Sequence, residues 1–252
     1  MVIQSVAGGA LPDFPGSVGL SALSVYPWPT ADHEHGGSAH VHLASAECYI
    51  VIGGRGRLQT LDHTGPGEHR LEPGDVVWFT PGTIHRAVND GDLQVMVLMQ
   101  NSGLPEAGDA VMTFPPEYLD PSRYPDAAST LDDLGRPSEE RARARRDLAL
   151  RGYDELLDQV RRGNTAALDD FYRAAARLAA PNLGPWTQLV EDGAAQSVAR
   201  TMQQIEALRS GDHSHLLQAE TARIAGPATQ SLGMCGFLRA YDPIRRSGGS
   251  DR

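Results

Sequence analysis

The sequence predicts a mainly β protein with an added α part: a closed, double-sheet jelly-roll barrel followed by an α-helical C-terminal region. Up to residue 99, about seven or eight short β-branched and aromatic runs alternate with Gly, Pro, Asn and Asp turns, as in closed β barrels. After residue 137, apolar residues recur at helical spacing. We therefore expect a barrel over residues 1–103, a connecting segment over 104–137, a helical region packed on the barrel over 138–246, and a disordered tail over 247–252.

The expected strands follow one another along the first hundred residues. A run from Val18 to Tyr26 forms the leading edge, and Cys48 to Ile52 ends at Gly53 and Gly54, which predict a hairpin turn. The later strands are predicted over residues 57–61, 69–71, 76–79, 84–88 and 93–99. The interior of this barrel is the expected ligand pocket.

His40 and His42 stand at i and i+2 in an extended segment, so their imidazoles point to the same face. Glu47 joins that face if the chain turns over residues 43–46. His85 follows in a second stretch, Thr80 to His85. Three histidines and a carboxylate from two neighbouring segments suit a divalent transition-metal ion with open positions, such as Fe(II), Mn, Ni, Cu or Zn. A metal site is the hypothesis, and ordinary core or surface histidines are the alternative.

The arrangement His-x-His-x4-Glu-x6-Gly, followed by Gly-x5-Thr-Pro-Gly-x2-His-x3-Asn, resembles the two signature motifs of the cupin superfamily over residues 38–100. Glu34 and Thr80 replace a glycine and a proline that the family usually has, and both differences concern turns. The resemblance implies a cupin-type double-stranded β-helix in which His40, His42, Glu47 and His85 hold one divalent transition-metal ion per chain, with Fe(II) favoured. Members of the family that have lost the metal keep the same barrel.

Several other side chains are relevant to the site. Tyr49, Arg57, Gln59 and Trp78 are candidates for the substrate pocket, with core packing as the alternative for each, and Glu47 is the candidate catalytic base. His33 and His35 form a second His-x-His pair in a glycine-rich stretch, which predicts a solvated loop. The two cysteines, Cys48 and Cys235, are interpreted as buried thiols.

The composition excludes some classes of function. All 22 basic residues are arginine, so a lysine Schiff base and a Walker A loop are excluded. The formal charge of −10 argues against a nucleic-acid or anionic-membrane partner. We expect a cytoplasmic protein with a small-molecule substrate, and the sequence leaves open whether the chain forms a homodimer.

Three helices are expected after the connecting segment. The first spans 138–163 with Ser138 as its N-cap, the second begins at Asn164 and ends before Pro181, and the third spans about 185–210. The arginines at 141, 143, 145 and 146 are flanked by acidic residues, which predicts a solvated helix face. His213 and His215 are read as the start of another helix.

Fold alone does not choose a reaction. The first functional hypothesis is a metal-dependent enzyme acting on a small molecule, an Fe(II)-type dioxygenase, because four protein ligands leave two positions for substrate and O2. The second is a non-redox metal-dependent isomerase, epimerase or lyase of a sugar-like or carbonyl substrate. The third is a small-molecule-binding cupin without turnover.

Overall fold

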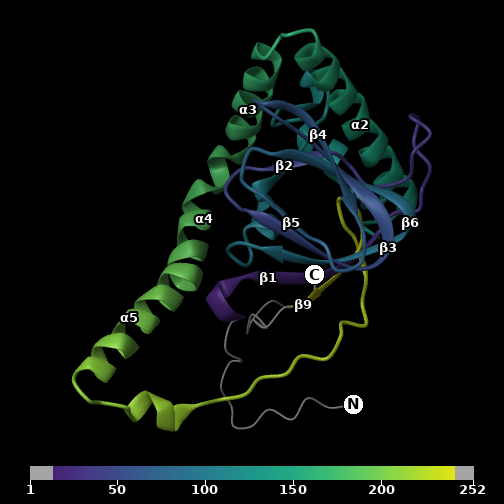
Figure 1. Ribbon diagram of the computed structural model, residues 1–252. Coiled ribbons are helices and arrows are strands. Elements are labelled where there is room, and N and C mark those ends of the chain that lie inside the picture. Colours follow the sequence, from purple (N-terminus) through teal and green to yellow (C-terminus); the bar gives the residue numbers. More distant parts are fainter. Residues whose placement is uncertain (1–13, 242–252) are drawn as a thin grey trace.

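A computed structural model describes residues 14–241 (Figure 1). Within them, the strands form one antiparallel nine-stranded sheet that curls into a barrel, with order β4-β3-β6-β1-β9-β8. β5 pairs with β3, and β2 pairs with β6 and β7. The strands are β1 (Gly19–Val25), β2 (His40–His42), β3 (Glu47–Asp62), β4 (Gly65–Leu71), β5 (Val76–Phe79), β6 (Ile84–Met99), β7 (Ala110–Met112), β8 (Ser231–Leu232) and β9 (Gly236–Tyr241). The predicted fold class, a β barrel followed by helices, is confirmed.

The two longest strands, β3 and β6, pair along most of their 16 residues. The hairpin turn predicted at Gly53 and Gly54 is wrong, because β3 continues through three register shifts between Val51 and Gly56. Gly54 has φ +69°, and a Cβ there would lie 2.1 Å from the carbonyl oxygen of Asp92. These bulges bend β3 without ending it, which lets one strand serve both halves of the barrel.

Four longer helices follow, together with the short α1 (Tyr124–Ala128): α2 (Glu139–Arg161), α3 (Ala166–Ala179), α4 (Leu183–Val190) and α5 (Gln196–Arg209). The Ser138 hydroxyl caps α2 by accepting the backbone N–H of Arg141. The cap predicted at Asn164 is wrong, because α3 starts after Thr165 and has no side-chain cap. The predicted third helix is divided into α4 and α5 by a π-helical turn, Glu191–Ala195.

Helices α2 and α3 pack on the barrel. Their apolar faces share one core cluster with the barrel strands, in which Val41 and Ile84 meet Leu150 and Phe171. Gly152 permits the close approach of α2, since a Cβ there would lie 2.0 Å from the carbonyl oxygen of Thr113. The connecting segment contributes β7, which pairs along the whole of β2. These contacts hold the strand that carries two candidate ligands.

Two expectations for the C-terminal half are corrected. Its last described part is not helical, because β8 and β9 return to the barrel and β9 pairs with β1. Arg145 and Arg146 are buried and not solvated: Arg145 donates to the Gly233 carbonyl oxygen and Arg146 to those of Trp28 and Pro29. They join α2 to the loop after β1 and to the β8–β9 turn, contacts that local charge pattern does not predict. The expected tail, 247–252, lies outside the described residues.

Helix α5 differs from the others in its surroundings. It continues the line of α4 away from the barrel (Figure 1), and none of its residues is buried. After it, a short 3-10 helix, η6 (Ser214–Gln218), leads into an extended segment that returns to β8. No helix among the described residues is long and apolar enough to cross a membrane.

Candidate metal centre

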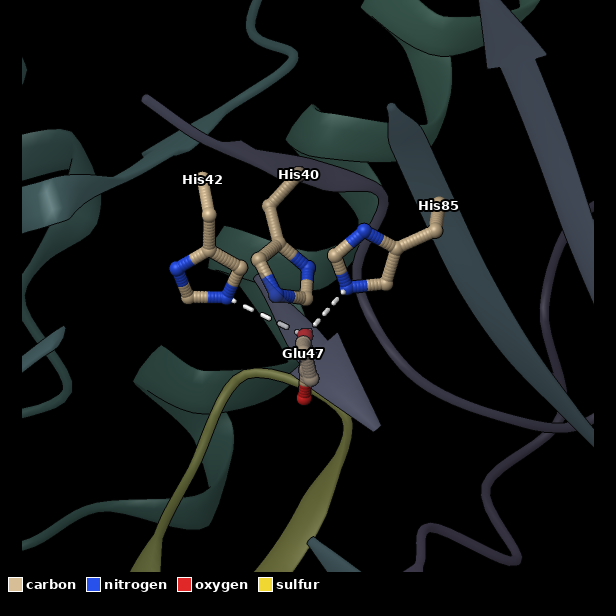
Figure 2. A group of neighbouring side chains, drawn as sticks. All are labelled: His40, His42, Glu47 and His85. Atoms are coloured by element: carbon tan, nitrogen blue, oxygen red, sulfur yellow. Dashed lines mark ion pairs between the residues drawn. The ribbon is translucent and has the colours of Figure 1, made fainter. Parts of the chain in front are cut away.

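Three strands bring the four expected ligands together. His40 and His42 lie on β2, Glu47 opens β3 and His85 lies on β6, directly opposite His40. One ligand atom from each residue lies within 4.8 Å of all the others (Figure 2). All four residues are buried, with His85 0% and Glu47 6% exposed. The cluster therefore forms a single buried group of donor atoms, as the spacing of the motifs predicted.

Each imidazole is oriented through its Nδ1 atom. The acceptors are the Ser38 carbonyl oxygen at 3.1 Å for His40, the Asp109 Oδ2 at 3.0 Å for His42, and the Thr83 carbonyl oxygen at 3.1 Å for His85. A carbonyl or a carboxylate only accepts, so each Nδ1 carries a hydrogen, and Nε2 is the atom of each imidazole that is left to bind a metal. This is the tautomer that a metal ligand requires, and such outer partners are typical of metal-binding histidines.

Glu47 faces the Nε2 atoms of two imidazoles. Its Oε2 lies 3.2 Å from the His42 Nε2 and 3.0 Å from the His85 Nε2. Even so, Glu47 Oε2 and His85 Nε2 are buried atoms without a hydrogen bond of acceptable geometry. Buried polar atoms normally have hydrogen-bond partners. A bound cation would satisfy these converging ligand atoms by coordination. The residues fit a divalent ion held by three imidazoles and one carboxylate.

The electrostatics of the cluster also favour a cation. Burial, together with the neighbouring His85 and His42, holds the pKa of His40 well below its usual value. Burial acts to raise the pKa of Glu47, but His85 and His42 outweigh it and hold that pKa below its usual range. Burial lowers the pKa of His42, while Asp109 and Glu47 raise it to about 9. Two carboxylates thus stabilise positive charge around His42.

Sequence reasoning missed Asp109. Its Oδ2 orients His42, and its Oδ1 accepts the backbone N–H groups of Leu43 and Ala44. Asp109 is 0% exposed, and it lies in the connecting segment, 67 residues from His42. No motif marks this position, so no sequence signal pointed to it.

Sequence reasoning also missed the position of Cys235, although it is buried as predicted. Its Sγ lies 3.9 Å from both the His40 Nδ1 and the Tyr49 hydroxyl. Burial raises the pKa of Cys235 to about 12, so the thiol stays neutral beside the ligands. The other cysteine, Cys48, is half-buried on the outer face of β3, which corrects its assignment as a buried thiol.

Only one of the four pocket candidates lies beside the cluster. Tyr49 is 1% exposed and points inward, with its ring centroid 6.5 Å from that of His85. Trp78 is 71% exposed on the outer surface, which corrects its placement in the lumen. Arg57 and Gln59 alternate with the inward Leu58 and bond to the exposed Glu68, so their placement in the lumen is also wrong.

The expected loop histidines lie outside the cluster. His33 and His35 are exposed, and His33 has φ +65°, in the left-handed region. His213 and His215 lie at the start of η6, at the far end of α5. Among the described residues, the group that could hold a metal ion consists of the four residues of the two motifs.

Comparison with solved structures gives partial matches at low similarity. The capsular polysaccharide assembling protein CapF from Staphylococcus aureus matches with a TM-score of 0.27 and 19% identity, over 39% of this chain and 24% of that one. The DMSP lyase DddQ from Ruegeria pomeroyi DSS-3 matches with a TM-score of 0.26 and 24% identity, over 34% and 40%. The nucleoside dehydratase Pac13 of Streptomyces matches with a TM-score of 0.26 and 15% identity, over 33% and 58%. The chain spans less than two thirds of each, and these matches carry no argument about activity.

No curated protein sequence matches the chain. The family model described as "Cupin domain" matches residues 30–100, the segment that contains both motifs and all four candidate ligands. This match assigns residues 30–100 to a cupin domain.

Proposed function

We propose that this cupin is a metal-dependent enzyme acting on a small molecule, and that it is an Fe(II)-type oxygenase. The observation that carries the proposal is the orientation of the three histidines, whose Nδ1 atoms are all occupied by acceptors while their Nε2 atoms converge with Glu47. When bound there, the ion supplies Lewis-acid polarisation of a substrate oxygen and, if it is iron, one-electron chemistry toward O2.

The chain's own residues would exclude water and hold the substrate. Phe79 lies with its ring centroid 4.2 Å from that of His85, and Tyr49 packs edge-on against Phe79. These rings give one side of the site an apolar wall, which strengthens electrostatic interactions inside it. A substrate with two adjacent oxygen donors suits a site with two open positions.

Glu47 is proposed as the residue that moves a proton. One of its oxygens faces the histidines, and the other points away from all three imidazoles (Figure 2). The lowered pKa keeps the group as a carboxylate at neutral pH, which both a ligand and a base require. A substrate on the outward side of Glu47 would give up its proton to that second oxygen.

A non-redox isomerase, epimerase or lyase is the second candidate. Tyr49 supports it, because its buried hydroxyl has a pKa held well above the usual value by burial and by Cys235 and Glu47. It therefore remains neutral and can donate a hydrogen bond to a substrate oxygen. Such a reaction would need no O2.

The first experiment measures metal content after purification without a metal-affinity column. His42→Ala removes one ligand and should lose most of the bound metal while keeping the β-rich circular dichroism spectrum. The matched control is His63→Ala, because His63 is exposed between β3 and β4. Full metal retention in His42→Ala would sink the assignment of the site.

The second experiment separates the two reaction classes. The Fe(II)-loaded protein is screened for O2 uptake with small hydroxy, keto and dicarbonyl compounds, and any turnover is repeated without O2. Substrate-dependent uptake supports the oxygenase, while turnover that survives anaerobic conditions assigns the non-redox class. Glu47→Gln should keep some metal and lose most turnover, whereas Glu155→Gln, on the exposed side of α2, should change neither.

A further inference from the structure

Helix α5 carries an apolar stripe that nothing in the described chain covers. Val198, Met202, Ile205 and Leu208 recur at i, i+4, i+7 and i+10, and they are 64%, 61%, 44% and 51% exposed. Beyond the helix, Leu216 and Leu217 of η6 are 58% and 81% exposed. Short helices in water are marginal, and most helical stability comes from packing of an apolar face. A 14-residue helix that carries this stripe and has no buried residue therefore needs a partner surface.

A second uncovered apolar surface lies on the outside of the barrel. We call it the outer sheet face, and it consists of the outward side chains of three strands, β5, β3 and β6: Val76, Trp78, Cys48, Ile50, Met96 and Leu98. Trp78 and Val76 of β5 are 71% and 53% exposed, and Trp78 is paired with Cys48 of β3. The half-buried Ile50, Met96 and Leu98 continue the surface across β3 and β6. No charged side chain occupies these positions, so covering them costs no desolvation of charge.

Within one chain, the apolar stripe of α5 does not lie on the outer sheet face. At its start α5 lies near the segment before β1, where Gly193 of the preceding turn approaches Ser17. From there it continues the line of α4 and points away from the barrel (Figure 1). The stripe and the outer sheet face therefore remain apart within one molecule.

We propose that the chain forms a two-fold symmetric homodimer in which α5 of each copy lies on the outer sheet face of the other. This arrangement is isologous, because both copies give the same two surfaces and the contact closes after two subunits. Pairing of α5 with α5 alone would leave Trp78 uncovered, and pairing of sheet with sheet would leave Met202 uncovered. The reciprocal arrangement covers both.

The available area matches what a stable dimer needs. Aromatic side chains bury about 150–250 Å2 each, and we take the low end, about 150 Å2, for a fully exposed large apolar side chain. The eight large apolar side chains of the stripe, η6 and the outer sheet face that are at least 44% exposed therefore offer roughly 700 Å2 per chain. Stable interfaces bury about 800 Å2 per partner, and the half-buried neighbours of Trp78 supply the remainder. The surfaces are large enough, apolar and uncharged, which is the composition of an interface core.

The first test is the mass of the full chain in solution over a range of concentrations, by sedimentation velocity. We expect a dimer whose dissociation constant rises at least 30-fold in Met202→Glu and in Trp78→Glu. The control is Gln203→Glu, which adds the same charge on another side of α5 and should leave the dimer unchanged. A monomer at all concentrations, or a dimer insensitive to both variants, would overturn the proposal.

The second test fixes the arrangement by cross-linking. Met202→Cys places a thiol on the stripe, and Cys48 already supplies one on the outer sheet face. A short bismaleimide should link two copies of Met202→Cys and should no longer do so when Cys48→Ser is added. Cross-linking that persists without Cys48 would show α5 against α5 and refute the proposed arrangement.

Measuring the metal content of the dimer variants tests the dimer separately from the proposed function. Met202 lies on α5, outside the metal cluster, so Met202→Glu should bind metal as the unmodified chain does. A monomeric variant with full metal content supports the dimer independently of catalysis. Circular dichroism of the same variant checks that the fold is kept.

Discussion

Replacing Asp109 by asparagine tests the orientation of one metal ligand without removing any ligand. Asp109 Oδ1 accepts two backbone N–H groups, from Leu43 and Ala44, while Oδ2 lies 3.0 Å from the His42 Nδ1. In Asp109→Asn the amide oxygen keeps the two backbone bonds, because only an acceptor satisfies them. The amide nitrogen then faces the His42 Nδ1 and donates to it, which moves the imidazole hydrogen to Nε2.

The size of the effect follows from that change of tautomer. A hydrogen on Nε2 occupies the lone pair that would bind the metal, so binding must first restore the other tautomer against a mispaired amide. Loss of an outer partner of a metal ligand typically weakens metal affinity 10-fold to 100-fold. We predict about a 30-fold loss, equivalent to about 2 kcal/mol.

The assay is competition with a chelator of known affinity, using Zn(II) or Co(II) to avoid oxidation of iron. Asp170→Asn is the control, because Asp170 is 71% exposed and pairs with Arg173 on the same helix. Circular dichroism establishes that both variants keep the barrel. A loss of less than threefold in Asp109→Asn would refute the tautomer argument, even if the four ligands are correct.

The remaining predictions concern stability. Gly152→Ala should lower the free energy of unfolding, because the added Cβ would lie 2.0 Å from the Thr113 carbonyl oxygen. This clash should outweigh the helix propensity of alanine, which normally favours a helix over glycine by about 1 kcal/mol. A higher unfolding midpoint in denaturant would contradict this packing of α2. Burial alone would raise the pKa of Asp32, but hydrogen bonds from Arg86 and Thr30 outweigh it and lower the pKa to about 2. The stability that Asp32 contributes is therefore present above its unfolded pKa of about 3.9 and lost as pH falls through 2, so the difference in melting temperature between the metal-free protein and Asp32→Asn should disappear near pH 2. Residues 1–103 expressed alone should aggregate, because the fragment lacks β7 and β9, the partners of β2 and β1; a soluble, metal-binding fragment would show an independent barrel domain.

The sequence by itself determined the barrel and the four candidate ligands. Local order accounts for three of the ligands: strand alternation places His40 and His42 on one face, and the turn before Glu47 brings the carboxylate to them. The fourth ligand, His85, came from the resemblance of the second motif to that of the cupin superfamily. The helix ends at Ser138 and Gly163 were also readable, because caps act on the nearest turn. Such features need no knowledge of distant residues.

The tertiary structure decided everything that depends on residues far apart in the sequence. Asp109 and Cys235 reach the histidines from 67 and 195 residues away, and no local period encodes these contacts. The bulges in β3 turned an expected hairpin into one bent strand, and strand parity placed Trp78 and Arg57 outside the lumen. The helical periodicity of α5 predicted a helix but not its surroundings. Whether an apolar stripe meets the chain's own core or another molecule depends on where the helix points, and only the three-dimensional fold determines that.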